Sequence, residues 1–274
     1  MNMAGKLMKA VWYNSYGGGS AGLKHVEIPI PSPGVNEILL KIEAASINPI
    51  DWKIQKGMVR PFLPKKFPVI PAGDVAGEIV EVGSGVKKFK AGDKIVSTLG
   101  AAGGGFAEYA VAKENLTVSR PPEVSAADGA SLVIAGCTAL HALTITGGIN
   151  LVKIQPRSNI LITAASGGVG HYAVQLAKLG NTHDSRSPNG KVIDLTPSGG
   201  AFWTYAVKKI TFSKKQLQPL LVVPKAEQIE CLLNYVKEGK LKTVIDSRYP
   251  LSRAEEAWEK SIEGHATGKV VVEP

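Results

Sequence analysis

The chain has 274 residues, of which 44% are hydrophobic and 20% charged, so its composition excludes a disordered protein. That length allows one or two domains. The formal charge of +9 and the pI of about 9.4 favour an anionic partner: a phosphorylated cofactor, an acidic membrane surface or nucleic acid. The lysines occur in scattered pairs and never in one long run, so a solvated basic surface is the alternative.

The cysteine count and the hydrophobic pattern exclude further classes. Cys137 and Cys231 are the only cysteines, which excludes a disulfide framework and a four-cysteine zinc site and favours a reducing compartment. The sequence contains no run of about 20 apolar residues, so we expect no membrane-spanning helix. The N-terminus has neither a hydrophobic leader nor the composition of a transit peptide, so we expect no cleavable targeting sequence.

The first 120 residues or so are typical of a β-rich domain. Short alternating segments are separated by turns rich in glycine and proline, and this spacing predicts a compact barrel. The expected strands are 6–13, 37–45, 76–82, 94–98 and 107–112.

The pattern changes after Pro121-Pro122, where residues 125–145 have apolar side chains at helical spacing. A buried strand is expected at 159–163, followed by the glycine turn 164–170 and a helix over 171–179 that ends at Gly180. Strand, glycine turn and helix occur in the order that a dinucleotide site requires.

The remaining segments alternate between the two element types after a polar, turn-like stretch at 181–189. A strand is expected at 191–195, helix and strand within 204–212, and an amphipathic helix over 226–237. A strand at 242–246, a helix over 251–262 and a final strand at 269–273 follow. Ser252 and Glu255 have the spacing of a capping box at the start of that last helix.

The glycine turn carries the clearest chemical signal. A dinucleotide pyrophosphate needs free backbone N–H groups at a helix N-terminus with no Cβ atoms in the way, and Ser166, Gly167, Gly168, Val169 and Gly170 offer that surface. An ordinary strand-to-helix turn is the alternative, but the flanking hydrophobic strand and helix favour the pyrophosphate site.

Two other segments are candidates for function. Asn48-Pro49-Ile50-Asp51-Trp52-Lys53 follows an expected strand on a turn fixed by proline, so its polar groups can line a cleft; a surface loop is the equal alternative. The series 73–78, 80–83 and 89–93 is rich in glycine, and we interpret those glycines as serving turns and bulges in the barrel.

These motifs in combination resemble the medium-chain dehydrogenase/reductase superfamily, in its zinc-free quinone oxidoreductase branch and most closely in plant members. The resemblance rests on Asn-Pro-Ile-Asp at 48–51, Gly-Asp-Val-Ala-Gly-Glu at 73–78, Gly-Gly-Phe-Ala-Glu-Tyr at 104–109, Ala-Gly-Cys-Thr-Ala at 135–139 and the turn at 164–170. Longer matching stretches are 48–67, 163–179, 205–216 and 264–274. The resemblance covers nearly the whole chain except 181–189.

The resemblance implies an α/β architecture of two domains. A GroES-like β-barrel catalytic domain would span 1–124 and be completed by about 248–274, and a Rossmann-type doubly wound domain would span 125–247. The implied activity is NADPH-dependent, zinc-independent reduction of quinones or of the C=C bond of α,β-unsaturated carbonyls. The zinc-bearing branch has Gly-His-Glu where this chain has Gly73-Asp74-Val75, and a cysteine ligand within the turn at 48–51, so no zinc is expected.

Site residues follow from the same resemblance, position by position. Asn48, Asp51 and Lys53 would border the nicotinamide and the substrate as catalytic residues, with Lys53 also contacting the cofactor. Thr138 would approach the ribose-nicotinamide end. Ser166, Gly167, Gly168 and Val169 would hold the pyrophosphate, and Gly268 and Lys269 would return to the cofactor cleft. For Lys53 and Lys269, a solvated surface position is the alternative.

The chain departs from the family after its glycine-turn helix. A second strand should follow at once and carry the residue that reads the ribose, but only 181–189 separate that helix from a strand that resembles one late in the family's sheet. The middle strands of the Rossmann-type domain are therefore expected to be absent, a loss of roughly 50–60 residues by the usual length of a strand-helix-strand unit. NADPH binding would then be weakened or lost.

This deletion leaves two functional alternatives open. The chain is either an active oxidoreductase with a quinone or enone substrate, or a cofactor-impaired relative that acts as a peripheral membrane or interaction protein held to anionic lipid. Nucleic-acid binding is disfavoured because the lysines are dispersed and no nucleic-acid-binding signature is present. An oligomer is left open. The resemblance implies a peripheral position at the chloroplast envelope, with a cytoplasmic one as the alternative.

Overall fold

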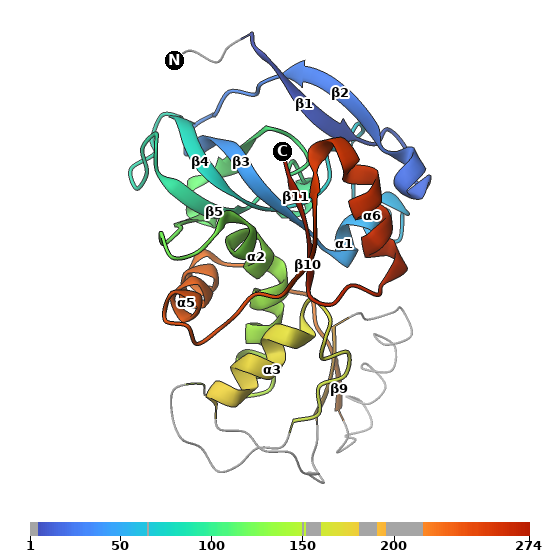
Figure 1. Ribbon diagram of the computed structural model, residues 1–274, viewed down its shortest axis with the longest axis vertical. Coiled ribbons are helices and arrows are strands. Elements are labelled where there is room, and N and C mark those ends of the chain that lie inside the picture. The colour runs from blue at the N-terminus through green and yellow to red at the C-terminus, as the bar shows by residue number, and fades with distance from the viewer. Residues whose placement is uncertain (1–4, 65, 150, 152–159, 181–190, 196–215) are drawn as a thin grey trace.

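The computed structural model describes residues 5–64, 66–149, 151, 160–180, 191–195 and 216–274. Strands from the first half of the chain gather at one end of the molecule, and helices from its middle lie at the other (Figure 1). The C-terminal strand returns to the first group, so the two ends of the sequence share one sheet.

That sheet has seven strands and contains the barrel predicted from the sequence. Its order is β10-β11-β3-β4-β5-β7, with β6 also paired to β3. The strands are β3 (Glu37–Ile47), β4 (Asp74–Val82), β5 (Lys94–Thr98), β6 (Tyr109–Lys113), β7 (Thr117–Ser119), β10 (Ile245–Pro250) and β11 (Lys269–Glu273). All pairs are antiparallel except β10 with β11. Because Val270 pairs with Ile47, the start of β11 lies beside the end of β3.

A hairpin and two helices cover the sheet. β1 (Leu7–Trp12) pairs with β2 (Lys24–Pro29) after the short turn η1 (Gly19–Gly22). Helix α1 (Pro49–Gln55) follows β3 directly, and α6 (Ala254–Glu263) packs beside it after the turn η5 (Leu251–Arg253). Trp258 of α6 is fully buried, and its indole N–H donates to Gln55 Oε1 of α1 over 3.0 Å. This bond fixes α1, and with it the polar residues at the start of α1.

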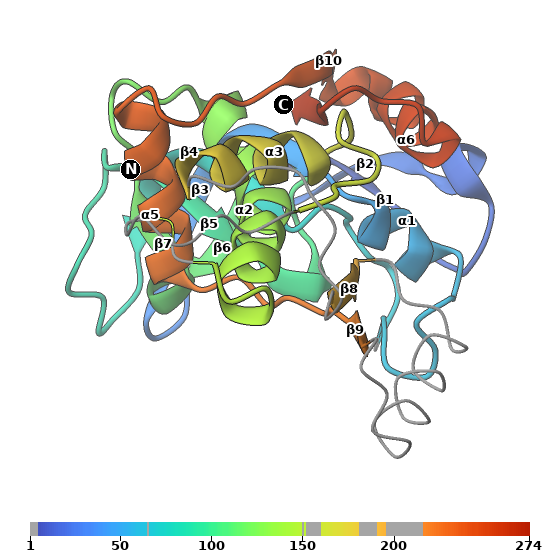
Figure 2. The same ribbon diagram turned by 90° about the horizontal axis from the view of Figure 1, so that it is seen from below.

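The helical end of the molecule is organised around α2 (Ala126–His141) and its continuation η4 (Ala142–Thr146). Helices α3 (Gly170–Leu179) and α5 (Ala226–Lys237) pack against α2, while the parallel pair β8 (Lys191–Asp194) and β9 (Gln216–Pro219) lies to one side of all three (Figure 2). Residues 126–146 are long and apolar enough to span a membrane by length and composition alone, but 61% of that window is buried inside the protein, as in a core helix.

Most of the expected elements are present. The strands at 94–98 and 269–273 and the helix at 226–237 have the predicted bounds, and the helix after the glycine turn begins one residue early. The short turns η2 (Gly100–Ala102) and η3 (Glu114–Leu116), the hairpin strand β2 and helix α1 were not predicted. The predicted segments 181–189 and 204–212 lie outside the described residues.

Three predictions were wrong. Residues 160–163 form no strand, and Leu161 is 85% exposed. The strand predicted at 242–246 begins instead at Ile245. The capping box at Ser252 does not form, because the helix starts at Ala254 after a 3₁₀ turn and the Glu255 carboxylate bonds to His25 over 2.7 Å.

Candidate active site

The first part of the site is the junction between β3 and α1. Asn48 ends the strand in an extended conformation and caps the helix, and Pro49 fits the first helical position because that position needs no N–H donor. The Asn48 N–H donates to Asp51 Oδ2 over 2.7 Å. Asn48 and Asp51, both predicted site residues, are therefore held together at a helix N-terminus and are 3% and 8% exposed.

Two further residues complete a buried polar cluster, which consists of Asn48, Asp51, Asp74 and Lys269. The Lys269 ammonium donates to Asn48 Oδ1 over 2.6 Å and to the carbonyl of Ile47 over 2.9 Å. The Asn48 amide NH₂ donates to Asp74 Oδ2 over 2.7 Å. Since Lys269 can only donate, and Asp74 accepts when ionised, the orientation of the Asn48 amide is determined by its two neighbours.

Asp74 links this cluster to the helical end of the molecule. It begins β4 and is fully buried, and its Oδ2 also accepts the backbone N–H of Ile134 in α2 over 2.9 Å. Its other carboxyl oxygen is buried and has no hydrogen-bond partner among the described residues. Our interpretation of the segment at 73–78 as purely structural therefore missed a member of the site.

Burial dominates the electrostatics of the cluster. It raises the pKa of Asp51 to about 7, with Asp74 adding to the rise and the Asn48 N–H and Lys269 opposing it. Burial likewise raises the pKa of Asp74 to about 6 against the opposing effect of Lys269, and it lowers the pKa of Lys269. Two carboxylates and one ammonium would leave a net negative charge inside the fold. The two carboxyl groups, with pKa values of about 7 and about 6, therefore gain and lose a proton close to neutral pH.

The glycine turn forms the second part of the site and leads into α3. A Cβ atom at Gly170 would lie 2.1 Å from the carbonyl oxygen of Ala164, so the turn can close only with glycine there. No hydrogen bond within the described residues occupies the N–H groups of Gly168, Val169 and Gly170. Free N–H groups at a helix N-terminus fit a pyrophosphate. Residues 181–190, where a ribose-reading residue should follow, lie outside the described part of the chain.

Two contacts hold the turn against the C-terminal segment. The N–H of Gly268 donates to the carbonyl of Ser166 over 2.8 Å. His171, in the first turn of α3, bonds through Nδ1 to the Gly167 carbonyl over 3.0 Å, and its Nε2 lies 3.3 Å from the N–H of Val244. The two contacts require a neutral ring that donates from Nδ1 and accepts at Nε2, in line with the pKa of His171, which burial lowers.

The two parts meet at Gly268 and Lys269. A Cβ atom on Gly168 would lie 3.3 Å from both the Gly268 carbonyl oxygen and Lys269 Cδ, so the turn touches the same lysine that bonds Asn48. The structure thus brings together most of the predicted site residues: Asn48, Asp51, Ser166, Gly167, Gly168, Gly268 and Lys269. Lys269 is 3% exposed, so the alternative of a solvated lysine is wrong for this residue.

Two predicted residues stand apart from these contacts, and a third, Val169, lies in the turn itself. Lys53 is half-buried on α1, with its ammonium 5.6 Å from the ring centre of Trp52. Thr138 is buried in α2, one turn beyond Ile134. Val169 is the N-cap residue of α3. Their predicted roles toward a cofactor remain predictions.

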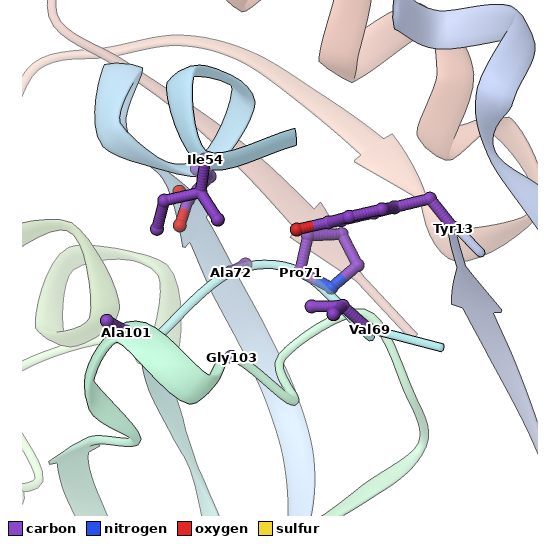
Figure 3. Close-up of a pocket in the computed structure, with 8 residues that line it drawn as sticks. Tyr13, Ile54, Val69, Pro71, Ala72, Ala101 and Gly103 are labelled. Atoms are coloured by element: carbon purple, nitrogen blue, oxygen red, sulfur yellow. The ribbon is translucent and has the colours of Figure 1, made fainter. Parts of the chain in front are cut away.

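A small open pocket adjoins the cluster on the barrel side (Figure 3). It is very small: of about 200 Å³ of open space counted with its mouth, only about 10 Å³ admits the centre of a water-sized sphere, which is room for about one water molecule or one ligand oxygen. Its lining is apolar apart from two side chains, and consists of Tyr13, Asp51, Ile54, Val69, Pro71, Ala72, Ala101 and Gly103. Tyr13 was not predicted from the sequence, because nothing in its segment distinguishes it from other strand-end aromatic residues.

Comparisons with known proteins agree with this geometry. Residues 34–122 match the family of alcohol dehydrogenase GroES-like domains, and residues 163–272 match the zinc-binding dehydrogenase family. A chloroplast envelope quinone oxidoreductase homolog of Arabidopsis thaliana is 57% identical over 99% of this chain and 100% of its own length. A chloroplastic quinone-oxidoreductase homolog of Spinacia oleracea is 53% identical with the same coverage. The solved quinone oxidoreductase of Coxiella burnetii is 28% identical with a TM-score of 0.86, covering 98% of this chain and 100% of that one.

The lengths of these alignments bear on the expected deletion. The alignment with the Arabidopsis protein runs over 329 positions, whereas this chain has 274 residues. At least 55 aligned positions, the difference between those two lengths, therefore have no residue in this chain. The size of the gap agrees with the predicted loss of middle strands. Its placement after α3 stays a prediction.

The glycine turn can be tested by adding one methyl group. Gly170→Ala is expected to weaken NADPH binding about tenfold or more, because the turn must open to relieve the contact with Ala164 and its N–H groups then lose their alignment. Fluorescence titration measures this. Gly264→Ala is the control: Gly264 has φ of 74° at the end of α6, and the nearest atom to an added Cβ would be the Ile262 carbonyl oxygen at 4.0 Å, so the change should cost about 1 kcal/mol of stability without changing NADPH affinity. Equal affinities in both variants would contradict the assignment of the turn.

Proposed function

The chain belongs to the quinone oxidoreductase branch of the medium-chain dehydrogenases/reductases, and from that membership we propose that it reduces quinones or the C=C bond of α,β-unsaturated carbonyls with NADPH. The reduced nicotinamide would supply the hydride. A conjugated oxygen on the acceptor already accommodates the developing negative charge, so this chemistry needs less electrophilic assistance than the reduction of a simple ketone.

One observation carries the proposal. The glycine turn, which fits a pyrophosphate, is joined through Gly268 and Lys269 to the buried polar cluster, and the cluster borders a pocket through Asp51. A cofactor held at the turn would thus have its reactive end near a small acceptor in the pocket. The names of more distant relatives support the choice of acceptor: one from Arabidopsis thaliana, 27% identical over 98% of this chain, is an NADPH-dependent alkenal/one oxidoreductase.

We propose that the reaction is independent of zinc. Asp74 and the turn at 48–51 stand where the zinc-bearing branch has ligands, and here the Asn48 side chain bonds to both Asp74 and Lys269. A buried ammonium that donates to Asn48 Oδ1 would repel a divalent cation at this place. Within the described ranges, no group of three or more His, Cys, Asp or Glu side chains is arranged to hold a metal ion.

We also propose a chloroplast location, since three relatives above 50% identity are named as chloroplast proteins. The residues described by the structure add no support for the alternative of a peripheral membrane protein. An uptake assay with isolated chloroplasts tests the location, and exclusion of the labelled chain from the organelle would contradict it.

The activity is tested by the consumption of NADPH with a panel of quinones and enones. We expect turnover with at least one member of the panel, a clear preference for NADPH over NADH, and no effect of a zinc chelator. The Gly170→Ala protein serves as the matched control because its pocket is unaltered. Absence of turnover with every acceptor, in a protein shown to be folded, would overturn the proposal.

The strength of NADPH binding is a separate question. An incomplete sheet beneath the adenosine would account for the missing positions and for the exposure of Leu161, at 85%, and of Leu195, at 37%. We therefore propose that NADPH binds more weakly than in a version of the chain with the missing segment restored from a relative. Fluorescence titration of both proteins measures the difference, and equal dissociation constants would contradict it.

A further inference from the structure

The pocket beside the cluster has two polar side chains, Tyr13 and Asp51, in an otherwise apolar wall. Figure 3 shows the Tyr13 ring entering from one side with its hydroxyl directed toward Ile54 of α1. A few convergent polar groups in an apolar pocket are the usual means of orienting a small ligand. The protonation states of Tyr13 and Asp51 therefore determine whether the pocket can bind a hydrogen-bond acceptor or a donor of the ligand.

Tyr13 is held rigidly and offers a hydrogen-bond donor. Its backbone N–H and carbonyl both pair with Val69 over 2.9 Å, and its ring packs edge-on against Phe67 with 6.0 Å between the ring centres. The side chain is 1% exposed, and burial together with nearby Asp51 raises its pKa well above the ordinary value. The phenol is therefore neutral, and within the described part of the chain no hydrogen bond occupies its hydroxyl.

Asp51 offers a second donor when it carries a proton. Its Oδ2 accepts the N–H of Asn48, so a proton on the carboxyl group belongs on the other oxygen, Oδ1. The charged groups that face this carboxyl are Asp74 of β4 and Lys269 of β11, with the phenol of Tyr13 on the pocket side. Burial and Asp74 favour the protonated form, and Lys269 and the Asn48 N–H oppose it.

We propose that Tyr13 and the protonated carboxyl of Asp51 form a subsite that binds the carbonyl oxygen of the acceptor by two hydrogen bonds. This rests on the proposed reduction of quinones or enones. The oxygen becomes negatively charged as hydride reaches the conjugated carbon or the quinone, and two preoriented donors in an apolar wall stabilise that charge. The pair supplies the electrophilic assistance that a metal ion gives in the zinc-bearing branch.

The subsite can be tested without cofactor, using 4-nitrophenol as a probe of oxyanion binding. We expect the protein to bind the probe as its phenolate, detected by visible absorbance. Tyr13→Phe and Asp51→Ala should each weaken binding about tenfold, whereas Asp51→Asn keeps a donor NH₂ group in place of the protonated carboxyl oxygen and should retain binding. Tyr16→Phe is the control, because the Tyr16 ring also packs on Phe67, at 4.9 Å between centres, but does not line the pocket. At each pH the affinity is expressed per ionised free probe; between about pH 6 and about pH 8 this affinity for the phenolate should fall, because Asp51 then loses its proton and repels the anion.

The same variants are then compared in turnover. Tyr13→Phe is expected to lower kcat/KM about a hundredfold with an enone while leaving the NADPH dissociation constant unchanged. Probe binding that is equal in Tyr13→Phe, Asp51→Ala and Tyr16→Phe would overturn the subsite. Probe binding that depends on Tyr13 and Asp51, in a protein that consumes no NADPH, would support the oxyanion subsite and overturn only the proposed reduction.

Discussion

Replacing Lys269 by methionine is expected to lower the free energy of unfolding by about 3–5 kcal/mol, the cost of removing one partner from a buried set of charges. Lys269 is 3% exposed and supplies the only ammonium group within the cluster. Methionine fills similar volume but leaves Asn48 Oδ1 and the Ile47 carbonyl without their donor. It also leaves Asp51 and Asp74 without the positive charge that stabilises their ionised forms. Urea denaturation measures the loss.

A surface lysine provides the matched control. Lys260 lies 3.7 Å from Asp246 in a partly exposed ion pair, so Lys260→Met should cost about 0–1 kcal/mol. Combining Lys269→Met with Asp74→Asn should recover part of the loss, because the second change removes a buried charge that has lost its partner. If Lys269→Met cost no more than Lys260→Met, Lys269 would not hold the cluster together.

The sequence was most informative where local pattern and tertiary structure agree. The barrel strands alternate and end at glycine turns, so β5 could be placed at Lys94–Thr98 from pattern alone. The glycine turn and α3 were predictable for the same reason, since strand, turn and helix signals lie within about 20 consecutive residues, less than one strand-helix-strand unit. His171, which was predicted to be structural, lies in the first turn of α3 and bonds to Gly167 of the glycine turn and to Val244.

The parts of the site and fold that the sequence did not predict depend on contacts between distant segments. Asp74 belongs to the site because β3, β11 and α2 converge on it, and its own segment reads as a glycine-rich strand. The one available signal was an acidic residue opening an apolar strand. The expected strand at 159–163 failed for a related reason, because a strand is stabilised by its neighbours in a sheet. Residues 160–163 form no strand, which is the result that the predicted loss of the neighbouring middle strands would produce.

Asp51 also gives the protein an expected dependence of stability on pH. Its pKa is about 7 in the folded chain against an ordinary value of 3.8, so the folded form holds the proton more tightly than the unfolded form. The stabilisation from this group is therefore fully present below about pH 3.8 and is lost as the pH rises through about 7. A shift of this size corresponds to a contribution on the order of 4 kcal/mol.

Asp51→Asn should flatten that dependence. Asparagine retains an oxygen that accepts the N–H of Asn48 but has no proton to lose. The unfolding free energy of the variant should therefore rise steadily relative to that of the wild type between about pH 4 and pH 8. Ion pairs lower the pKa values of some exposed carboxylates, such as Glu78 and Glu256. These groups make stability fall at low pH, opposite to the effect of Asp51, but they are present in both proteins. The difference between the two unfolding free energies, measured by urea denaturation at each pH, thus reports the titration of Asp51 together with its coupling to Asp74. Parallel profiles would mean that Asp51 is ionised throughout this range, and the protonated carboxyl that the carbonyl subsite requires would then be absent.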